Sequence, residues 1–289
     1  MHPKSDPAKH GVRVLKDVPY RNTGLSAHTL DVYVPEGAEN APVVLYIHGG
    51  GFRILSKETH WAMALAFAAR GYVTFSINYR LAPGDPFPAA AEDACAAYRW
   101  VCENAEQFGG DSHNIVLAGE SAGANLVCAT TVAATYERPE PWAAAVFEMG
   151  RVPTAILPAA GMLEVSNSHR FSERRALPQF IQDRIGEVAS GYLKDSPPEV
   201  SKDLANPLVI LETMQPDRPL PPAFASVGTA DPLLDDTRRF AAAYQARGGE
   251  CEVRYYPGEV HAFHAFLWRK AAQECWQDHY KFLDERVRS

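Results

Sequence analysis

Two short glycine-rich segments contain the residue types needed for nucleophilic attack on a carbonyl carbon. The segment Gly119-Glu120-Ser121-Ala122-Gly123 has the G-x-S-x-G spacing that places a serine on a sharp strand-to-helix turn. The segment His48-Gly49-Gly50-Gly51-Phe52 is a glycine run whose bare backbone N–H groups can approach a reacting carbonyl. The two motifs together predict a serine nucleophile and a nearby site for the negative charge that its attack creates.

A serine hydroxyl is a poor nucleophile until a base removes its proton and an acid orients that base. The predicted base is His261, which follows a short β-rich run near the carboxyl terminus; His264, three residues on, is the alternative base and otherwise a structural or pocket-rim histidine. The predicted acid is Asp231, just beyond another apolar run. Asp235 and Asp236 are the alternative candidates for the acid, although their position favours the first turn of a helix, where they would interact with the helix dipole.

The elements that must position these residues follow from the hydrophobic pattern. Short apolar runs predict strands near residues 12–18, 29–34, 43–47, 73–77, 115–118, 154–158, 224–227 and 251–256. Amphipathic stretches between them predict helices near residues 57–70, 89–108, 121–135, 235–247 and 271–286. Nearly continuous apolar runs are typical of parallel strands covered on both faces, and the first two runs, joined without a helix, indicate an antiparallel edge. The pattern predicts an α/β fold with a mostly parallel sheet of about eight strands.

One region interrupts the alternation of strands and helices. Residues 163–222 are rich in charge and proline, with one helical stretch near 177–193 and an expected extended return over 207–222. A long insertion at the carboxyl edge of a parallel sheet can cover an active-site crevice and shape the substrate pocket. The alternative is a surface insertion that makes no contact with substrate. We therefore expect a core of residues 1–162 and 223–289 and a cap or lid of residues 163–222.

Composition limits the class of protein. The 289 residues carry a net charge of −7, which argues against nucleic acid or an anionic membrane as the main partner. Five cysteines form no C-x-x-C pair, and no apolar signal-peptide core or membrane-length apolar run is evident. No cluster with metal-ligand spacing is evident either. We expect a cytoplasmic enzyme without metal or cofactor.

Several segments resemble the hormone-sensitive-lipase-like carboxylesterases, the bacterial family IV esterases of the α/β-hydrolase fold. Besides the two glycine motifs, the similar segments are Tyr79-Arg80-Leu81-Ala82-Pro83, residues 87–93, residues 110–115 and Asp231-Pro232-Leu233-Leu234-Asp235. The similarity extends from about residue 31 to the carboxyl terminus. It implies the α/β-hydrolase fold and hydrolysis of small, short-chain carboxylic esters through an acyl-enzyme, with no cofactor. Relatives are monomers or homodimers, and either state is open here.

The resemblance also implies a role for each matching residue. Ser121 would be the nucleophile, His261 the general base and acid, and Asp231 the residue that orients the histidine. The remaining implied residues support the oxyanion hole, the two motifs or the pocket. The oxyanion donors would be the N–H groups of Gly50, Gly51 and Ala122; His48, Gly49, Gly119 and Gly123 would support the loop and the turn; Phe52, Glu120, Phe263 and His264 could line the pocket.

The sequence departs from the family pattern in three places, of which the first affects the expected pocket and the other two remove no chemical group from the mechanism. Only 47 residues precede His48, so we expect a reduced cap that leaves the mouth open or covered by residues 163–222 alone. Gly84 stands where relatives often have Glu, and Ala262 where Gly is common after the histidine.

Two other functions remain as alternatives to a short-chain esterase. They are an arylformamidase or lactonase with the same triad, and a small-ligand-binding module without catalysis.

Overall fold

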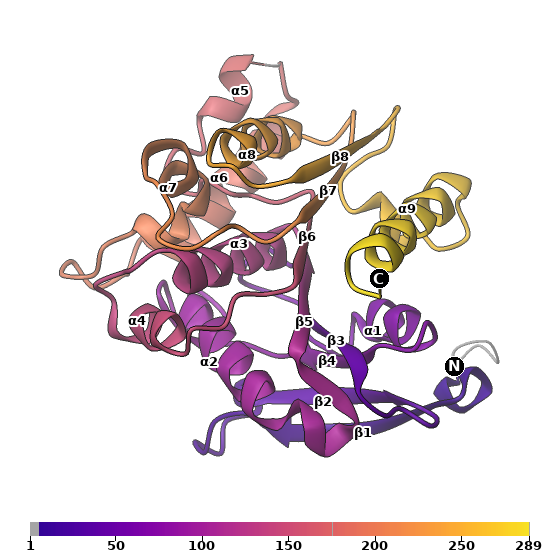
Figure 1. Ribbon diagram of the computed structural model, residues 1–289. Helices are drawn as coiled ribbons and strands as arrows, with labels where there is room; N and C mark the ends of the chain where they lie inside the picture. Colours follow the sequence, from indigo (N-terminus) through magenta and orange to yellow (C-terminus); the bar gives the residue numbers. More distant parts are fainter. Residues whose placement is uncertain (1–5, 175, 289) are drawn as a thin grey trace.

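The computed structural model describes residues 6–174 and 176–288 and arranges them around one eight-stranded sheet (Figure 1). Residues 1–5 and 289 of the predicted core and residue 175 of the predicted cap lie outside the described residues. The strands are β1 (Val12–Pro19), β2 (Thr29–Pro35), β3 (Ala41–Ile47), β4 (Val73–Ile77), β5 (Gly110–Glu120), β6 (Ala155–Ala159), β7 (Ala223–Gly228) and β8 (Cys251–Tyr256). Their order is β1-β2-β4-β3-β5-β6-β7-β8, and only β2 pairs antiparallel, with β1 and with β4. The predicted α/β fold and its antiparallel edge are confirmed.

The register of the central strands brings the two glycine motifs together. Strands β3 and β5 are parallel neighbours, and Ile47 at the end of β3 pairs with Gly119 near the end of β5. The loop that starts at His48 therefore leaves the sheet beside the turn that contains Ser121. Residues 43–47 of β3 are fully buried, as expected for a strand covered on both faces.

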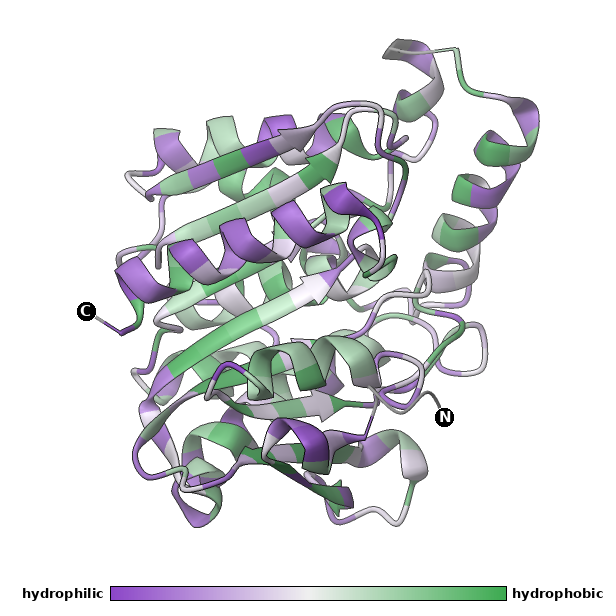
Figure 2. Cartoon of the chain, turned by 90° about the vertical axis from the view of Figure 1, so that its right-hand side faces the viewer, coloured by the Kyte–Doolittle hydropathy of each residue, from purple (hydrophilic) through white to green (hydrophobic). Residues whose placement is uncertain are grey.

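Helices cover both faces of the sheet. In Figure 1, α1 (Trp61–Ala68) and α9 (Lys270–Arg286) lie on one side, and α2 (Ala89–Asn104), α3 (Ala122–Thr135), α4 (Pro141–Glu148) and α8 (Leu234–Ala246) lie on the other. Every residue of α3 is buried, because this helix packs between the sheet and its neighbours α2 and α4. Figure 2 shows the opposite case in α9, which ends at the carboxyl terminus and presents mostly hydrophilic residues outward. No helix among residues 6–174 and 176–288 is long and apolar enough to cross a bilayer.

The segment between β6 and β7 contains more helix than the sequence predicted. It forms α5 (Arg170–Arg174), α6 (Gln179–Leu193) and α7 (Pro207–Thr213), in the upper part of Figure 1. The expected extended return over 207–222 is therefore wrong for its first part. Pro207 occupies the start of α7, where its missing N–H and fixed φ suit a helix. Helix α7 packs against α3 and α8, so it joins the helical layer of the core.

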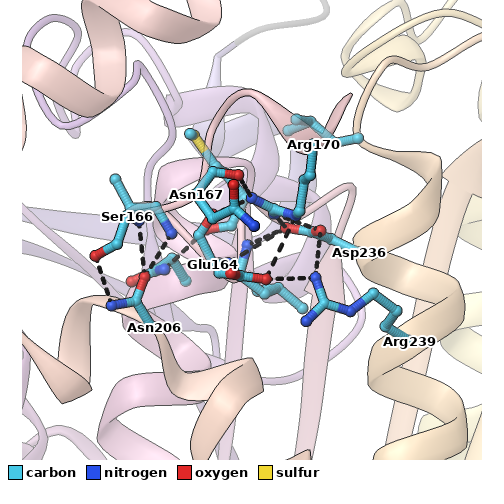
Figure 3. A network of polar contacts seen from close by, with 12 residues as sticks. Glu164, Ser166, Asn167, Arg170, Asn206, Asp236 and Arg239 are labelled. Atoms are coloured by element: carbon cyan, nitrogen blue, oxygen red, sulfur yellow. Dashed lines mark hydrogen bonds and ion pairs between the residues drawn. The ribbon is translucent and has the colours of Figure 1, made fainter. Parts of the chain in front are cut away.

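A polar network fixes the start of the insertion to α8 (Figure 3). The buried carboxylate of Asp236 accepts hydrogen bonds from the backbone N–H groups of Leu163 and Glu164 and pairs with Arg170 at 2.6 Å. The side-chain oxygen of Asn206 accepts the next two backbone N–H groups along the chain. Asp236, a rival for the role of triad acid, thus anchors the insertion.

Candidate active site

The turn between β5 and α3 lifts Ser121 out of the sheet. Ser121 has φ +53° and ψ −116°, a strained conformation for a residue with a side chain. Gly123 permits the turn, because a Cβ atom there would lie 2.0 Å from the backbone oxygen of Ile47. The strain persists because the strand, the helix and the adjacent loop are packed closely around it. The predicted motif is therefore the tight strand-to-helix turn that exposes a serine hydroxyl.

The structure brings Ser121, His261 and Asp231 together in one chain of hydrogen bonds. Nε2 of His261 lies 3.0 Å from Oγ of Ser121, and Nδ1 of His261 lies 2.8 Å from one carboxylate oxygen of Asp231. The other oxygen of Asp231 accepts the backbone N–H of Leu233 at 2.8 Å, and the carboxylate is buried. Asp235 instead lies 3.7 Å from Arg238. Of the acids considered from the sequence, Asp231 is the one that contacts His261.

The carboxylate of Asp231 determines the charge behaviour of His261. Burial alone lowers the pKa of a histidine because it disfavours the cation. The charge of Asp231 and its hydrogen bond outweigh burial, so that the pKa of His261 is raised above its ordinary value. An imidazole of raised basicity that faces a serine hydroxyl can accept the hydroxyl proton and hold it as a stabilised cation.

The glycine loop forms the opposite wall of the site. Gly50 has φ +111°, and a Cβ atom on it would lie 2.0 Å from the backbone oxygen of Ile54, so this position requires glycine. Gly50, Gly51 and Ala122, the three predicted oxyanion donors, line the same cavity as Ser121. Their place beside Ser121 is compatible with the predicted role as oxyanion donors.

His48 supports the glycine loop from inside the protein. Its ring is buried, stacks on Tyr79 with centroids 4.3 Å apart, and has Nδ1 2.7 Å from the backbone oxygen of Gly49. Burial lowers the pKa of His48 to about 4, so the ring is neutral at pH 7. The hydroxyl of Tyr79 donates to the backbone oxygen of His48 at 2.9 Å. These contacts fit the supporting role that the resemblance implies.

A cavity of about 780 Å³ opens in front of Ser121 and His261. Much of its wall comes from the insertion, so the segment is not a plain surface excursion. The lining residues from the insertion are Ala176, Leu177, Pro178, Phe180, Ile181, Arg184, Ile185 and Val188. Phe180 is 69% exposed at the rim. The cavity is thus mainly apolar, with the catalytic candidates at its base and α6 along one side.

The four predicted pocket residues divide into two pairs. Phe52 and Glu120 do line the cavity, although both are almost fully buried. Phe263 and His264 are absent from the cavity lining, because Phe263 packs on Tyr256 with ring centroids 4.9 Å apart and His264 contacts Glu120. These two side chains thus lie outside the cavity lining, and His264 has the structural surroundings that the sequence also allowed for it.

The lining residues on α6 were not predicted individually. The amphipathic pattern of residues 177–193 was visible in the sequence, but it does not identify the surface that the apolar face meets. His60 was also missed as a neighbour of the site; it contacts Glu120, and no motif marks it. Both omissions concern contacts between segments far apart in the chain.

Comparisons with known proteins agree with this geometry. A family model described as "alpha/beta hydrolase fold" matches residues 44–265. Carboxylesterase NlhH of Mycobacterium tuberculosis is 33% identical over 246 residues, which span 83% of this chain and 72% of that protein. An acetyl esterase of Salmonella schwarzengrund is 28% identical over 264 residues, 90% of this chain and 77% of that protein.

The solved structures show the same relationship. A crystal structure of an esterase from the bacterial hormone-sensitive lipase family superposes with a TM-score of 0.74 and 27% identity, covering 96% of this chain and 85% of that one. The chain belongs to the α/β-hydrolase fold family, within its hormone-sensitive-lipase-like carboxylesterases. It is accordingly an enzyme of the carboxylic ester hydrolase class.

Proposed function

We propose that this carboxylic ester hydrolase cleaves small, short-chain esters through an acyl-enzyme on Ser121. The observation that carries the proposal is the continuous hydrogen-bond chain from Asp231 through His261 to Ser121, which ends in an apolar cavity. His261 acts as general base and then general acid, and Asp231 holds its ring and stabilises its cation. The backbone N–H groups of Gly50, Gly51 and Ala122 form the oxyanion hole.

The reaction proceeds in two halves. In the first, Oγ of Ser121 bonds to the carbonyl carbon while Nε2 of His261 takes its proton, and the carbonyl oxygen becomes an oxyanion. Collapse of this intermediate breaks the ester C–O bond, and His261 gives its proton to the departing alcohol. In the second half, His261 deprotonates a water molecule whose oxygen attacks the acyl carbon. Collapse of this second intermediate breaks the bond to Oγ of Ser121, and His261 returns its proton to that oxygen, which releases the carboxylic acid and the free serine. The amino terminus of α3, directly behind Ser121, adds a favourable dipole for the oxyanion.

The insertion completes the substrate site in this proposal. We assign residues 163–193 to a cap whose helix α6 covers one side of the acyl or alcohol pocket, and we assign α7 to the core. Short-chain esters are supported by the related acetyl esterase and by the family resemblance. The five free cysteines support a further proposal, that the enzyme works in a reducing compartment such as the cytoplasm.

The test is release of p-nitrophenol from acyl esters of two to twelve carbons by the wild-type enzyme and by Ser121→Ala. We expect wild-type turnover to peak at the short chains and to disappear in the variant, with an unchanged unfolding temperature. Residual activity above about a thousandth of wild type would point to another nucleophile. Failure of the wild-type enzyme on all chain lengths, with turnover of formamides or lactones instead, would overturn the ester assignment.

A further inference from the structure

Glu120, the residue before the nucleophile, is a buried carboxylate held between two histidines. Its side chain is 7% exposed, and its two oxygens each lie 2.7 Å from an imidazole nitrogen. One nitrogen is Nε2 of His60, at the start of α1, and the other is Nε2 of His264, in the turn after β8. The cluster therefore joins three segments that surround the nucleophile, and the mechanism above uses none of its side chains.

The hydrogen bonds around His60 define its protonation state. Nδ1 of His60 lies 2.9 Å from Oγ1 of Thr59 and 3.2 Å from the backbone oxygen of Ser56. The hydroxyl of Thr59 donates its only hydrogen to that same backbone oxygen, at 2.7 Å. Both neighbours of Nδ1 are therefore acceptors, so Nδ1 carries a proton. The pKa of His60 is raised by its hydrogen bond to Glu120 and by the charge of that carboxylate, which favours a proton on Nε2 as well and a positive charge on the ring.

A cationic His60 keeps Glu120 ionised in spite of its burial. Burial lowers the pKa of His60, but the hydrogen bond and charge of Glu120 outweigh it and the pKa is raised. Burial raises the pKa of Glu120, but hydrogen bonds from His264 and His60 outweigh it and hold the pKa well below its usual range. The ionised carboxylate is acceptor-only, and its second oxygen faces Nε2 of His264 in a close contact of 2.7 Å.

His264 lies in the same short turn as the base His261. Between them, Ala262 has φ +54° and ψ +29°, the left-handed region that residues other than glycine and asparagine seldom adopt. Such a conformation persists only where its surroundings hold it. Inside the turn, the backbone oxygen of Ala262 accepts the N–H of Ala265 at 3.0 Å. Two further contacts tie the turn to the rest of the protein through His264: its ring contacts Glu120, and its backbone oxygen accepts the indole N–H of Trp276 at 3.1 Å.

We propose that Glu120 is a positioning residue that acts through His264 to hold the turn of residues 261–264, so that Nε2 of His261 points at Oγ of Ser121. The proposal rests on the catalytic roles proposed above for His261 and Ser121. Glu120 touches neither reacting atom in this scheme. Loss of its contact with His264 lets Ala262 relax from the left-handed region, which turns the imidazole of His261 away from the serine.

The experiment compares two replacements of His264 in the full chain. The amide nitrogen of His264→Gln can take the place of Nε2 and still donate to Glu120, whereas His264→Phe fills the volume without a donor. With p-nitrophenyl butyrate, we expect His264→Phe to lower kcat by about ten- to a hundredfold and to change KM by less than about threefold. We expect His264→Gln to stay within about threefold of the wild-type kcat. A merely space-filling role for His264 would give the opposite order and would overturn the proposal.

A second pair of variants tests the backbone strain directly. Glycine adopts positive φ without cost, so Ala262→Gly should restore part of kcat, at least about threefold, in the His264→Phe background and change the wild-type enzyme little. No gain in that background would contradict the proposal. If His264→Phe does not fold, Ala262→Gly in the Glu120→Gln background makes the same comparison.

The control is His28→Phe, which removes another buried histidine with a carboxylate partner, Asp93, that belongs to no part of the site. We expect this variant to lose thermal stability and keep kcat. A fall in kcat equal to that of His264→Phe would show a general effect of core damage and would overturn the proposal. Activity that survives Ser121→Ala would instead refute the proposed function, so the two failures are distinguishable.

Discussion

Replacing Asp231 by asparagine should disable the base while leaving the site in place. One oxygen of Asp231 accepts the backbone N–H of Leu233, so the amide oxygen of an Asp231→Asn variant must stay there, since an amide nitrogen cannot accept that bond. The amide NH₂ then faces Nδ1 of His261. Nδ1 becomes an acceptor, the ring proton moves to Nε2, and that proton points at the hydroxyl of Ser121. The imidazole in this tautomer has no lone pair for the serine proton.

The expected loss can be worked from the contact between the two side chains. Nδ1 of His261 is 2.8 Å from the carboxylate oxygen, and an effective dielectric constant of about 20 describes charge pairs in proteins. Two unit charges about 4 Å apart attract by about 4 kcal/mol under those conditions, which corresponds to about a thousandfold in rate. The wrong tautomer adds to this loss. We expect kcat to fall by about 10³–10⁴ and KM to change little.

The assay is the pH dependence of kcat/KM with p-nitrophenyl butyrate from about pH 5 to pH 9. The raised pKa of His261 means that the wild-type base is lost as pH falls through a value above that of an ordinary histidine. Without the carboxylate the pKa falls, so the acid limb of the residual activity should move to lower pH. Asp235→Asn, an acid from the same segment with a partly exposed side chain, is the matched control and should keep wild-type activity.

Three results would refute the reasoning about Asp231. A fall in kcat of less than about tenfold would mean that the carboxylate neither orients nor stabilises the imidazole. A shift of the acid limb to higher pH would contradict the sign of the electrostatic effect. An equal loss in Asp235→Asn would show that the acid has been assigned to the wrong residue.

Three further perturbations test the loop, the insertion and the rim. Gly50→Ala should lower kcat by about a hundredfold, because the added Cβ clashes with backbone and displaces a proposed oxyanion donor. The control Gly37→Ala, also at positive φ but in open space, should keep the wild-type kcat. Equal kinetics in the two variants would contradict this expectation. Asp236→Asn should lower the free energy of unfolding in urea by about 3 kcal/mol, because it breaks a buried ion pair, and a loss below about 1 kcal/mol would show that the insertion is held elsewhere. Phe180→Ser should leave the unfolding temperature unchanged and raise KM more for twelve-carbon than for two-carbon esters; an equal effect on both would exclude Phe180 from the chain-binding surface.

The sequence was sufficient for the features that depend on local pattern. Strand β8 and strand β4 begin and end where the hydrophobic runs predicted, because runs of β-branched and aromatic residues are directly visible in the chain. The meeting of His261 with Ser121 was also predictable, since both follow strands of one parallel sheet and the carboxyl ends of such strands share an edge. Helix α7 was not predicted, because the prolines that follow it suggest extended chain. Pro207 at its first turn is compatible with a helix, and packing against α3 and α8 favours one, but this packing is not visible in the sequence.

The contacts that were not predicted are those in which a side chain pairs with a residue far away in the chain, although its position in the sequence suggests a local role. Asp236 has the position of a helix-dipole residue, yet its role depends on Arg170, which lies 66 positions earlier in the chain. Asp231 lies in the turn that leads into the same helix, α8. This helix therefore lies next to both the proposed triad acid and the start of the insertion, whose residues 176–188 contribute to the cavity wall. A substitution that changes how the insertion packs on α8 acts on the same helix that follows Asp231. Variants of this interface should therefore change acyl-chain preference and kcat together. Variants of the cavity rim on α6 should change acyl-chain preference and leave kcat unchanged.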